Sequence, residues 1–312
     1  MRATNAAGST DSPVINVTTH EAVPTSVSAP TVRPVDGRYD RLLITWSAPH
    51  RPNGIIRTYI VRRNDSTVRN LTVSGGEMRL EYVDDGLLAD TIYSYAVSAC
   101  TSAGCTTGDR STARTNEHVP ASVLPPSAAV LNSSAVRVSW TPPTQANGRI
   151  VRYQLTANGT VVYSGLETTH VVAGLQPYAL YEFVVWACTS AGCTNSTSTA
   201  ARPDEDLPEH LPVPTVRVTS TRSVEISWRS PIRPNGLITT YDLRRNGTLI
   251  QRTAVTWYVD YDCQPGTTYG YRVTAYNSKG GVDSPVAFAT TFSSAPEGTR
   301  RTKACDLAFH SS

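Results

Sequence analysis

The feature that most constrains this sequence is a residue pattern that occurs three times with the same internal spacing. Each copy starts at a tryptophan and continues with proline at +3, Asn-Gly at +7 and +8, isoleucine at +10 and tyrosine at +13. The copies begin at Trp46, Trp140 and Trp228. A tyrosine-led block follows each copy, and its first residues, spaced by 88 positions, are Tyr93, Tyr181 and Tyr269. This period is too long for a helical solenoid unit and suits a small β-sandwich.

The residues before each tryptophan alternate in the way that a half-buried strand requires. In the first copy Leu42, Ile44 and Trp46 share one side, whereas Leu43 and Thr45 lie on the other. The other two copies and the tyrosine blocks alternate in the same way. A period of two predicts β-strands with one face in a core. No segment has the 3.6-residue stripe of an amphipathic helix, so we expect an all-β chain.

The two blocks together resemble the fibronectin type III family, a seven-stranded, immunoglobulin-like β-sandwich. That family has a core tryptophan on its second strand and a tyrosine corner, Leu-x-Pro-x-x-x-Tyr, where the sixth strand begins. The second unit matches the corner fully, but Ala89 replaces its proline in the first unit and Cys263 its leucine in the third. The resemblance implies tandem sandwiches whose structural core includes Trp46, Tyr93, Trp140, Tyr181, Trp228 and Tyr269.

The repeat also predicts how the chain is divided. Residues 22–117, 118–206 and 207–295 are expected to form three whole modules. Residues 1–21 align with the end of a unit, so they are expected to be the C-terminal hairpin of a preceding module, loose or opportunistically docked. Residues 296–312 lack a strand pattern and are expected to form a disordered tail.

Two cysteine pairs occur in one repeated phrase, Ala-Cys-Thr-Ser-Ala-Gly-Cys, between the sixth and seventh strands. If each pair flanks a four-residue hairpin loop, its Cα atoms lie about 4.5–5.5 Å apart, within disulfide range. The third unit has Tyr276 and Gly281 there, so both cysteines are present or both are absent. We predict two disulfides, with free thiols as the alternative, between Cys100 and Cys105 and between Cys188 and Cys193.

The two remaining cysteines suggest no metal site. Cys263 stands where leucine is usual and is expected to be a buried hydrophobe. Cys305, in the tail, is expected to be a free thiol. A zinc site is disfavoured, because no Cys-x4-Cys pair has a second pair or a histidine nearby to complete four ligands.

The charged residues do not point to catalysis or to nucleic acid. The net charge is +3, and the basic residues are scattered instead of forming a phosphate-binding patch. No catalytic or nucleotide-binding motif occurs, and His50 and Asp84 are expected at solvated turns. The acidic stretch 204–206 with Glu209 could hold Ca²⁺, but a polar linker is the simpler interpretation. We therefore expect no cofactor and no enzymatic activity.

Asn-x-Ser/Thr sequons indicate the secretory pathway. The sequence has neither a signal peptide at its start nor an apolar run long enough for a membrane span, so a fragment or truncated isoform of an extracellular protein is expected. Seven sequons make glycosylation plausible, at Asn16, Asn64, Asn70, Asn132, Asn158, Asn195 and Asn246.

Three functions fit a tandem array of this kind. The first is an adhesion or spacer segment of a large cell-surface or matrix protein. The second is a ligand-binding ectodomain fragment of another receptor, for example of the phosphatase type. The third is an accessory array of a secreted enzyme, which the sequons and paired cysteines disfavour.

The cysteine phrases at 99–106 and 187–194 carry a more specific resemblance. They are similar to those of a very large cell-surface protein that has laminin-type domains, dozens of type III modules, a membrane span and a short cytoplasmic tail. That resemblance implies a role in links between stereocilia and in the photoreceptor ciliary region, hence in hearing and vision. It also implies collagen IV and fibronectin as partners.

Overall fold

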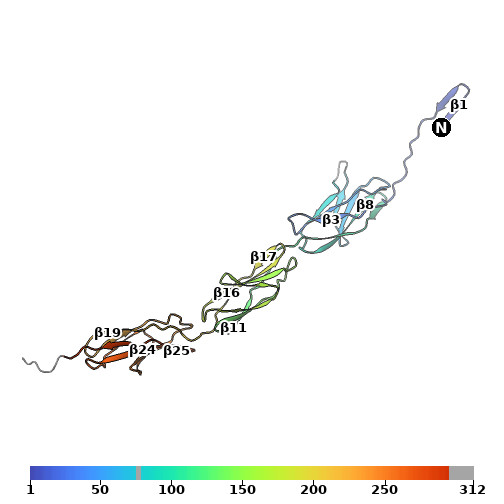
Figure 1. Cartoon of the computed structure of the whole chain (residues 1–312). Helices are drawn as coiled ribbons and strands as arrows, with labels where there is room; N and C mark the ends of the chain where they lie inside the picture. Colours follow the sequence, from blue (N-terminus) through green and yellow to red (C-terminus); the bar gives the residue numbers. More distant parts are fainter. Residues whose placement is uncertain (75–78, 295–312) are drawn as a thin grey trace, which may run out of the picture.

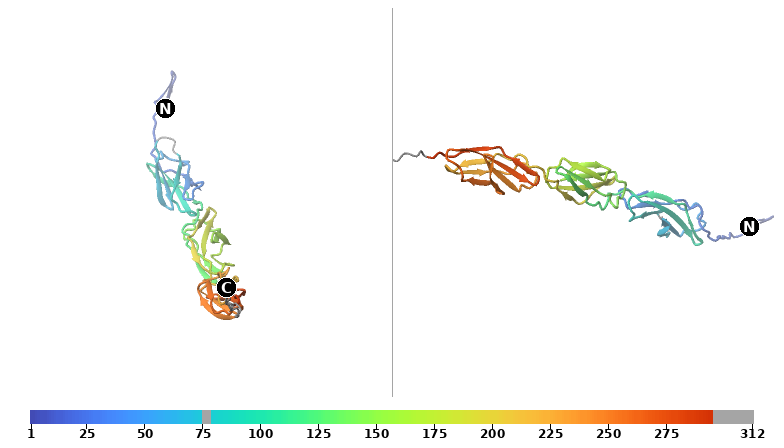
Figure 2. Two further views of the ribbon diagram at one scale, coloured as in Figure 1. Left: turned by 90° about the vertical axis from the view of Figure 1, so that its left-hand side faces the viewer. Right: turned by 90° about the horizontal axis from the view of Figure 1, so that it is seen from below.

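The chain forms three β-sandwiches that follow one another in a row (Figure 1). The computed structural model describes residues 1–74 and 79–294, and every regular element in that part is a strand. The three sandwiches, called modules 1, 2 and 3, span residues 31–114, 127–201 and 215–290. The predicted fold class, tandem all-β sandwiches, is confirmed. Figure 2 shows the same elongated array from two further directions.

Each module packs a three-stranded sheet against a larger one. In module 1 the order of the smaller sheet is β3-β4-β7, and that of the larger is β10-β8-β5-β6, with β9 also paired to β8. The strands are β3 (Thr31–Pro34), β4 (Leu42–Thr45), β5 (Thr58–Arg63), β6 (Ser66–Thr72), β7 (Glu81–Asp84), β8 (Ile92–Thr101), β9 (Gly104–Thr107) and β10 (Ser111–Arg114).

Modules 2 and 3 repeat this topology with antiparallel pairing throughout. Module 2 contains β11 (Ser127–Asn132), β12 (Ala135–Ser139), β13 (Arg152–Ala157), β14 (Thr160–Gly165), β15 (Thr169–Ala173), β16 (Tyr181–Thr189), β17 (Gly192–Asn195) and β18 (Thr199–Ala201). Module 3 contains β19 (Thr215–Val218), β20 (Val224–Ser227), β21 (Thr240–Arg245), β22 (Thr248–Thr253), β23 (Trp257–Asp260), β24 (Thr268–Asn277), β25 (Gly280–Asp283) and β26 (Ala287–Thr290).

The seventh strand of each sandwich is split into two pieces. At the break in module 2, the backbone N–H of Ser196 donates to the carbonyl of Val185 at 2.8 Å. In module 3, the N–H of Ser284 donates to the carbonyl of Val273, also at 2.8 Å. The serine hydroxyl accepts the N–H of the same valine. This hydroxyl replaces a ladder bond where the strand bends, so the predicted seven-stranded plan holds with a bend in its last strand.

The alternating residues form the cores, as the sequence predicts. In module 3, Val224 and Ile226 of β20 are fully buried against Tyr271 and Val273 of β24. Burying each such side chain stabilises the fold by about 1.5–3 kcal/mol relative to leaving it in water. Trp140 and Trp228 are each 6% exposed, and Trp46 is half-buried.

The tyrosine corner forms in all three modules. Its hydroxyl accepts a hydrogen bond from the backbone N–H five residues upstream, from Leu88 to Tyr93 at 3.0 Å, from Gln176 to Tyr181 at 2.9 Å and from Gln264 to Tyr269 at 2.8 Å. Neither Ala89 nor Cys263 prevents the bond. Cys263 is 1% exposed and packs in the core of module 3, which confirms its expected role as a buried hydrophobe.

A separate hairpin precedes module 1. It pairs β1 (Arg2–Asn5) with β2 (Gly8–Asp11), all of its residues are exposed, and it stands away from the sandwiches in Figure 1. The chain between Asp11 and Glu21 forms no strand. The predicted disordered tail, 296–312, with its predicted free Cys305, lies outside the described residues.

Candidate functional site: the joints between modules

Within each stretch between consecutive modules, 115–126 and 202–214, three successive residues bind the modules on both sides, and we call these three residues the joint. The first joint is Asn116-Glu117-His118 and the second is Asp204-Glu205-Asp206. The two segments occupy the same place in the repeat, 88 positions apart. Each residue of a joint has its own hydrogen-bonding partners, so the joints are described below residue by residue.

The central glutamate of the first joint binds two loops of the following module. Its Oε1 accepts the backbone N–H of Arg149, at 2.9 Å, just after the Asn-Gly turn that links the two sheets. Its Oε2 accepts both the backbone N–H, at 3.1 Å, and the hydroxyl of Ser190 at the tip of the β16–β17 hairpin. We call this arrangement the glutamate clamp.

The clamp repeats at every module. Glu205 accepts the N–H groups of Leu237, at 2.7 Å, and Ser278, at 3.2 Å. Glu21 does the same at module 1 with Ile55, at 3.0 Å, and Ser102, at 3.1 Å. The predicted boundaries placed all three glutamates, Glu21, Glu117 and Glu205, with the preceding unit, but their side chains bind the module that follows.

These bonds hold the clamp carboxylates in the ionised form. The hydroxyl of Ser102, with the N–H of Ile55, lowers the pKa of Glu21 to about 2. The hydroxyl of Ser190 is the largest cause of a lowered pKa at Glu117, and the Leu237 N–H is the largest cause at Glu205. Hydrogen bonds donated to a carboxylate favour its charged form, which explains the common direction.

The first residue of each joint binds the module before it. The carbonyl of Asn116 accepts the N–H of Asp90 at 3.1 Å, and that of Asp204 accepts the N–H of Tyr178 at 3.2 Å. Asp90 and Tyr178 occupy equivalent turns of modules 1 and 2, and both have a positive φ, 49° and 58° respectively. This left-handed conformation is uncommon for non-glycine residues, and here it coincides with the inter-strand turn that binds the joint.

A second turn of the preceding module also binds the first joint residue. The side-chain amide of Asn116 donates to the carbonyl of Arg38 at 2.9 Å. In the second joint the backbone N–H of Asp204 donates to the equivalent carbonyl, that of Asn132, at 3.3 Å. The same acceptor position is therefore used twice, with a side-chain donor in one joint and a backbone donor in the other.

The third residue of each joint contacts both modules. The N–H of His118 donates to the carbonyl of Asn147 at 2.8 Å, and its ring stacks on Tyr39 of module 1 with 3.7 Å between ring centroids and 9° between planes. In the second joint Asp206 takes this place. Its N–H donates to the carbonyl of Asn235 at 2.8 Å, and its Oδ2 accepts the hydroxyl of Ser133 at 2.8 Å.

Tyr39 and Ser133 occupy the same repeat position, seven residues before the core tryptophan. The two joints therefore share one geometry but differ in chemistry, an aromatic stack in the first and a hydrogen bond in the second. Every joint residue has a partner in a flanking module, which distinguishes these segments from a linker that makes no contacts.

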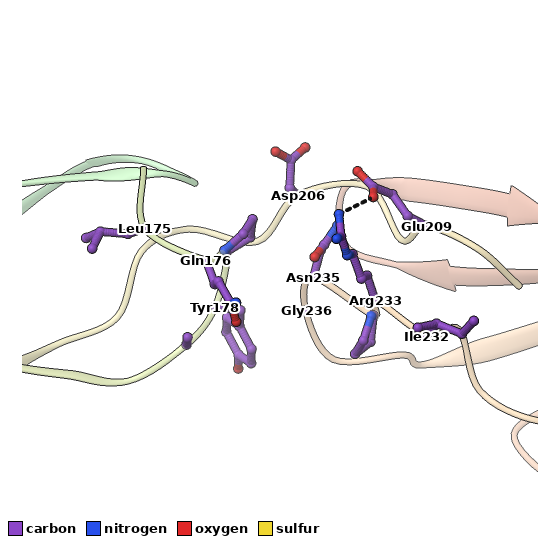
Figure 3. A pocket seen from close by; sticks show the side chains of 12 residues that line it. Leu175, Gln176, Tyr178, Asp206, Glu209, Ile232, Arg233, Asn235 and Gly236 are labelled. Carbon is purple, nitrogen blue, oxygen red and sulfur yellow. Dashed lines mark hydrogen bonds and ion pairs between the residues drawn. The ribbon is translucent and has the colours of Figure 1, made fainter. Parts of the chain in front are cut away.

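The acidic stretch at the second joint does not converge on one point. The Glu205 carboxylate binds N–H groups of module 3, that of Asp206 binds Ser133 and the Leu207 N–H, and that of Glu209 pairs with Arg233 at 3.4 Å. In residues 1–74 and 79–294 no group of three or more His, Cys, Asp or Glu side chains is placed to hold a metal ion. The second joint instead borders a cleft of about 760 Å³ between the turn at Tyr178 and the turn at Arg233 (Figure 3).

The predicted cysteine pairs lie beside the clamp. The structure bonds Cys100 to Cys105 and Cys188 to Cys193, with Cα atoms 4.0 Å apart in both. Strand pairing continues to the residue after Cys100, because Thr101 faces Gly104. The hairpin turn is therefore two residues long, and the expected four-residue loop is wrong.

All seven predicted glycosylation asparagines are exposed: Asn16, Asn64, Asn70, Asn132, Asn158, Asn195 and Asn246. Three of them occupy one turn of the repeat, with φ of 47°, 48° and 47°, and these are Asn64, Asn158 and Asn246. Their side-chain oxygens accept a backbone N–H from the neighbouring strand of the larger sheet, β8, β16 or β24, at 3.0, 2.8 and 2.8 Å respectively. Each of these side chains therefore bonds its turn to the adjacent strand of the larger sheet.

Asp84 was expected at a solvated turn, and the structure corrects this. It is 4% exposed, and its Oδ2 accepts the hydroxyl of Tyr95 at 2.7 Å and the guanidinium of Arg63 at 2.9 Å. Burial alternates along β7, and Asp84, its last residue, lies on the buried side, so its carboxylate faces the core. His50 is exposed, as expected of a turn residue.

The same network recurs in module 3 and is absent from module 2. Module 3 pairs Asp260 with Arg245 and with Tyr271, each at 2.9 Å. The equivalent residues of module 2 are all apolar: Ala157, Val172 and Phe183. The sequence repeat contained a hint of this network, because the three positions are polar together in modules 1 and 3 and apolar together in module 2. Only the register of the sheets shows that the three side chains are in contact.

Three curated relatives show what this chain is similar to. It is 40% identical to usherin of Homo sapiens over 94% of its length and 38% identical to usherin of Mus musculus over 96%. It is 28% identical to phosphatidylinositol phosphatase PTPRQ of Homo sapiens over 93% of its length. The matches span only 6% of either usherin and 13% of the phosphatase.

The segment is thus similar to a small part of much longer proteins. Among the described residues no helix is long and apolar enough to cross a bilayer. The fibronectin type III domain model matches residues 26–115, 123–202 and 208–290, which include all three sandwiches. The chain belongs to the fibronectin type III family.

Proposed function

We propose that this segment is a non-enzymatic extracellular spacer within a large usherin-like cell-surface or matrix protein. The observation that carries the proposal is the joint, in which three residues are bonded to the modules on both sides. A spacer has to hold its modules at a fixed separation, and an array without flexible linkers does so. Similarity to a type III region of usherin over nearly the whole chain supports the extracellular placement.

The more specific role in this proposal comes from that similarity alone. By it, the segment contributes length to links between stereocilia of hair cells and to a structure that maintains photoreceptors, so it serves hearing and vision. Collagen IV and fibronectin are the proposed partners of the protein that contains it. The sequons and the paired cysteines agree with this setting, whether as a matrix protein or as the ectodomain of a single-pass membrane protein.

An alternative is a ligand-binding ectodomain segment of a phosphatase-type receptor. The similarity to PTPRQ over 93% of the chain favours it. The two proposals differ in what they require of the surface, since a receptor segment needs a face that binds ligand, whereas a spacer needs only fixed joints.

The spacer proposal is tested by the distance between spin labels placed in modules 1 and 2. A narrow distance distribution is expected for the unmodified chain, and Glu117→Ala should broaden it because module 2 loses its hold on the joint. Glu167→Ala is the matched control, since that exposed side chain makes no hydrogen bond or ion pair with another module in the part of the chain that the structure describes. A broad distribution in the unmodified chain would contradict the proposal.

A further inference from the structure

Module 3 has a surface groove next to its single predicted glycosylation asparagine, Asn246. The groove has a volume of about 440 Å³, and its lining includes Asn246, Gly270, Arg272 and the side chains of Val286 and Phe288. Phe288 points outward from β26 and is 71% exposed. Covering this ring would remove apolar surface from water, which is favourable.

Asn246 and Phe288 lie on either side of Gly270. The Gly270 N–H donates to Asn246 Oδ1 at 2.8 Å, and the Asn246 N–H donates to the Gly270 carbonyl at 2.8 Å. A Cβ at Gly270 would lie 3.1 Å from the Phe288 ring, tighter than ordinary contact. The absent side chain thus lets the ring lie across the backbone that holds the asparagine.

This arrangement leaves the reactive atom of Asn246 available. Its Oδ1 is held by the sheet, and in the part of the chain that the structure describes no protein acceptor binds its Nδ2. An N-linked glycan is attached through that nitrogen in the sequon Asn246-Gly247-Thr248. The first sugar would therefore start at the mouth of the groove.

The repeat provides an internal comparison. At the position of Phe288, modules 1 and 2 have Thr112 and Ala200, and at the position of Gly270 they have Ser94 and Glu182. Their sequons at the same turn thus have neither the aromatic ring nor the glycine beside it. The ring and the glycine occur together, and only in module 3 of the three described.

We propose that Asn246 carries an N-linked glycan whose first N-acetylglucosamine packs on Phe288 in this groove. The apolar C–H face of a pyranose can cover the ring, while Arg272 and Asp283 at the groove edge offer a donor and acceptors to its hydroxyl and acetamido groups. The occupant is covalently tethered, so a small contact suffices. The inference rests on the extracellular placement proposed above.

The test uses the whole chain secreted from mammalian cells, in four forms: unmodified, Phe288→Ala, Thr248→Ala and the double variant. Hydrogen exchange of β24 and β26 then reports module 3 alone. Phe288→Ala should raise exchange roughly two- to tenfold in the glycosylated chain, the range typical of aromatic contacts. It should change little when Thr248→Ala has removed the sequon, so the two changes should not add.

Trimming the glycan to one N-acetylglucosamine should preserve the effect, because only the first sugar reaches the ring. Exchange of the equivalent strands in module 2 should be unaffected by Phe288→Ala. An unoccupied Asn246, or equal effects of Phe288→Ala with and without the sequon, would overturn the proposal. Neither outcome affects the spacer proposal, whose spin-label distances can be measured on chain without glycans.

Discussion

At the scale of single residues, the clamp glutamate shows how one carboxylate organises a module. Its two oxygens bind a turn between the sheets and the tip of a hairpin, which lie far apart in sequence. The sequence showed a Glu before each module, but in a linker that residue is ordinary. Only its position relative to two distant loops reveals the role, because that requires the third dimension.

The clamp predicts a dependence of stability on pH. The pKa of Glu21 is lowered from 4.5 to about 2 in the folded state. A lowered folded-state pKa contributes stability that is present above the unfolded value and lost as pH falls through the folded one. We therefore expect stability of module 1 to decline between about pH 4.5 and 2. Glu21→Gln should flatten that part of the profile measured by urea unfolding, and an unchanged slope would contradict the assignment.

The buried network of module 1 gives a second prediction. Asp84→Ala leaves Arg63 and the hydroxyl of Tyr95 without their partner, and it should destabilise the module by about 3 kcal/mol. Changing all three residues to those of module 2, as Arg63→Ala, Asp84→Val and Tyr95→Phe, should cost much less. Urea denaturation distinguishes the two. A triple variant that is less stable than Asp84→Ala would show that the network has no apolar substitute in this setting.

At the scale of elements, the strands followed from the sequence more directly than their ends did. Alternation in β4 and β8 gave the core faces correctly, because burial of a strand face depends on local pattern. The split in the seventh strand and the two-residue hairpin turn did not follow from it. Both depend on hydrogen bonds between strands, such as the one that the Ser196 hydroxyl makes, and alternation alone does not contain that information.

The hairpin disulfides should be dispensable for the clamp. Module 3 makes the same contact through Ser278 without any disulfide, with Tyr276 and Gly281 in place of the cysteines. Replacing Cys188 and Cys193 by serine should therefore cost at most about 2 kcal/mol, as expected of a short loop. Hydrogen exchange at Ser190 should stay slow. Rapid exchange there would show that the disulfide holds the clamp.

The bonding of the cysteines is itself checkable. Peptides prepared without reduction from secreted chain should contain Cys100 linked to Cys105 and Cys188 linked to Cys193 in mass spectra. Cys263 should resist alkylation until the chain is unfolded, because it is buried and burial raises the pKa of its thiol. Alkylation of Cys100 or Cys188 in native secreted chain would contradict the pairing.

At the scale of the whole molecule, the three modules were predictable and their arrangement was not. The repeat predicted three sandwiches because each one folds around its own tryptophan and tyrosine. The joints depend instead on pairs such as Tyr39 with His118, which the repeat places at matching positions but whose contact crosses two domains. The residue types do not identify these contact pairs, since the equivalent pair in the second joint is serine and aspartate.

The joint can be opened without harming the modules. An insertion of four residues, all glycine or serine, between Asn116 and Glu117 would leave Asn116 bonded to module 1 and Glu117 bonded to module 2. The stability of both modules should stay within about 0.5 kcal/mol, the range of surface changes. Small-angle X-ray scattering should show a broader range of end-to-end lengths. Unchanged scattering would mean that other contacts fix the angle.

The glutamate clamp also decides how a pulled chain carries load. Tension from an upstream module enters at the joint, where Glu117 is bonded both to the turn leading out of the smaller sheet and to a hairpin of the larger sheet. Force is therefore divided between the two sheets before it reaches the first strand of the module. Because the hydrogen bonds at this point are accepted by an ionised carboxylate, this division of load depends on the charge of Glu117.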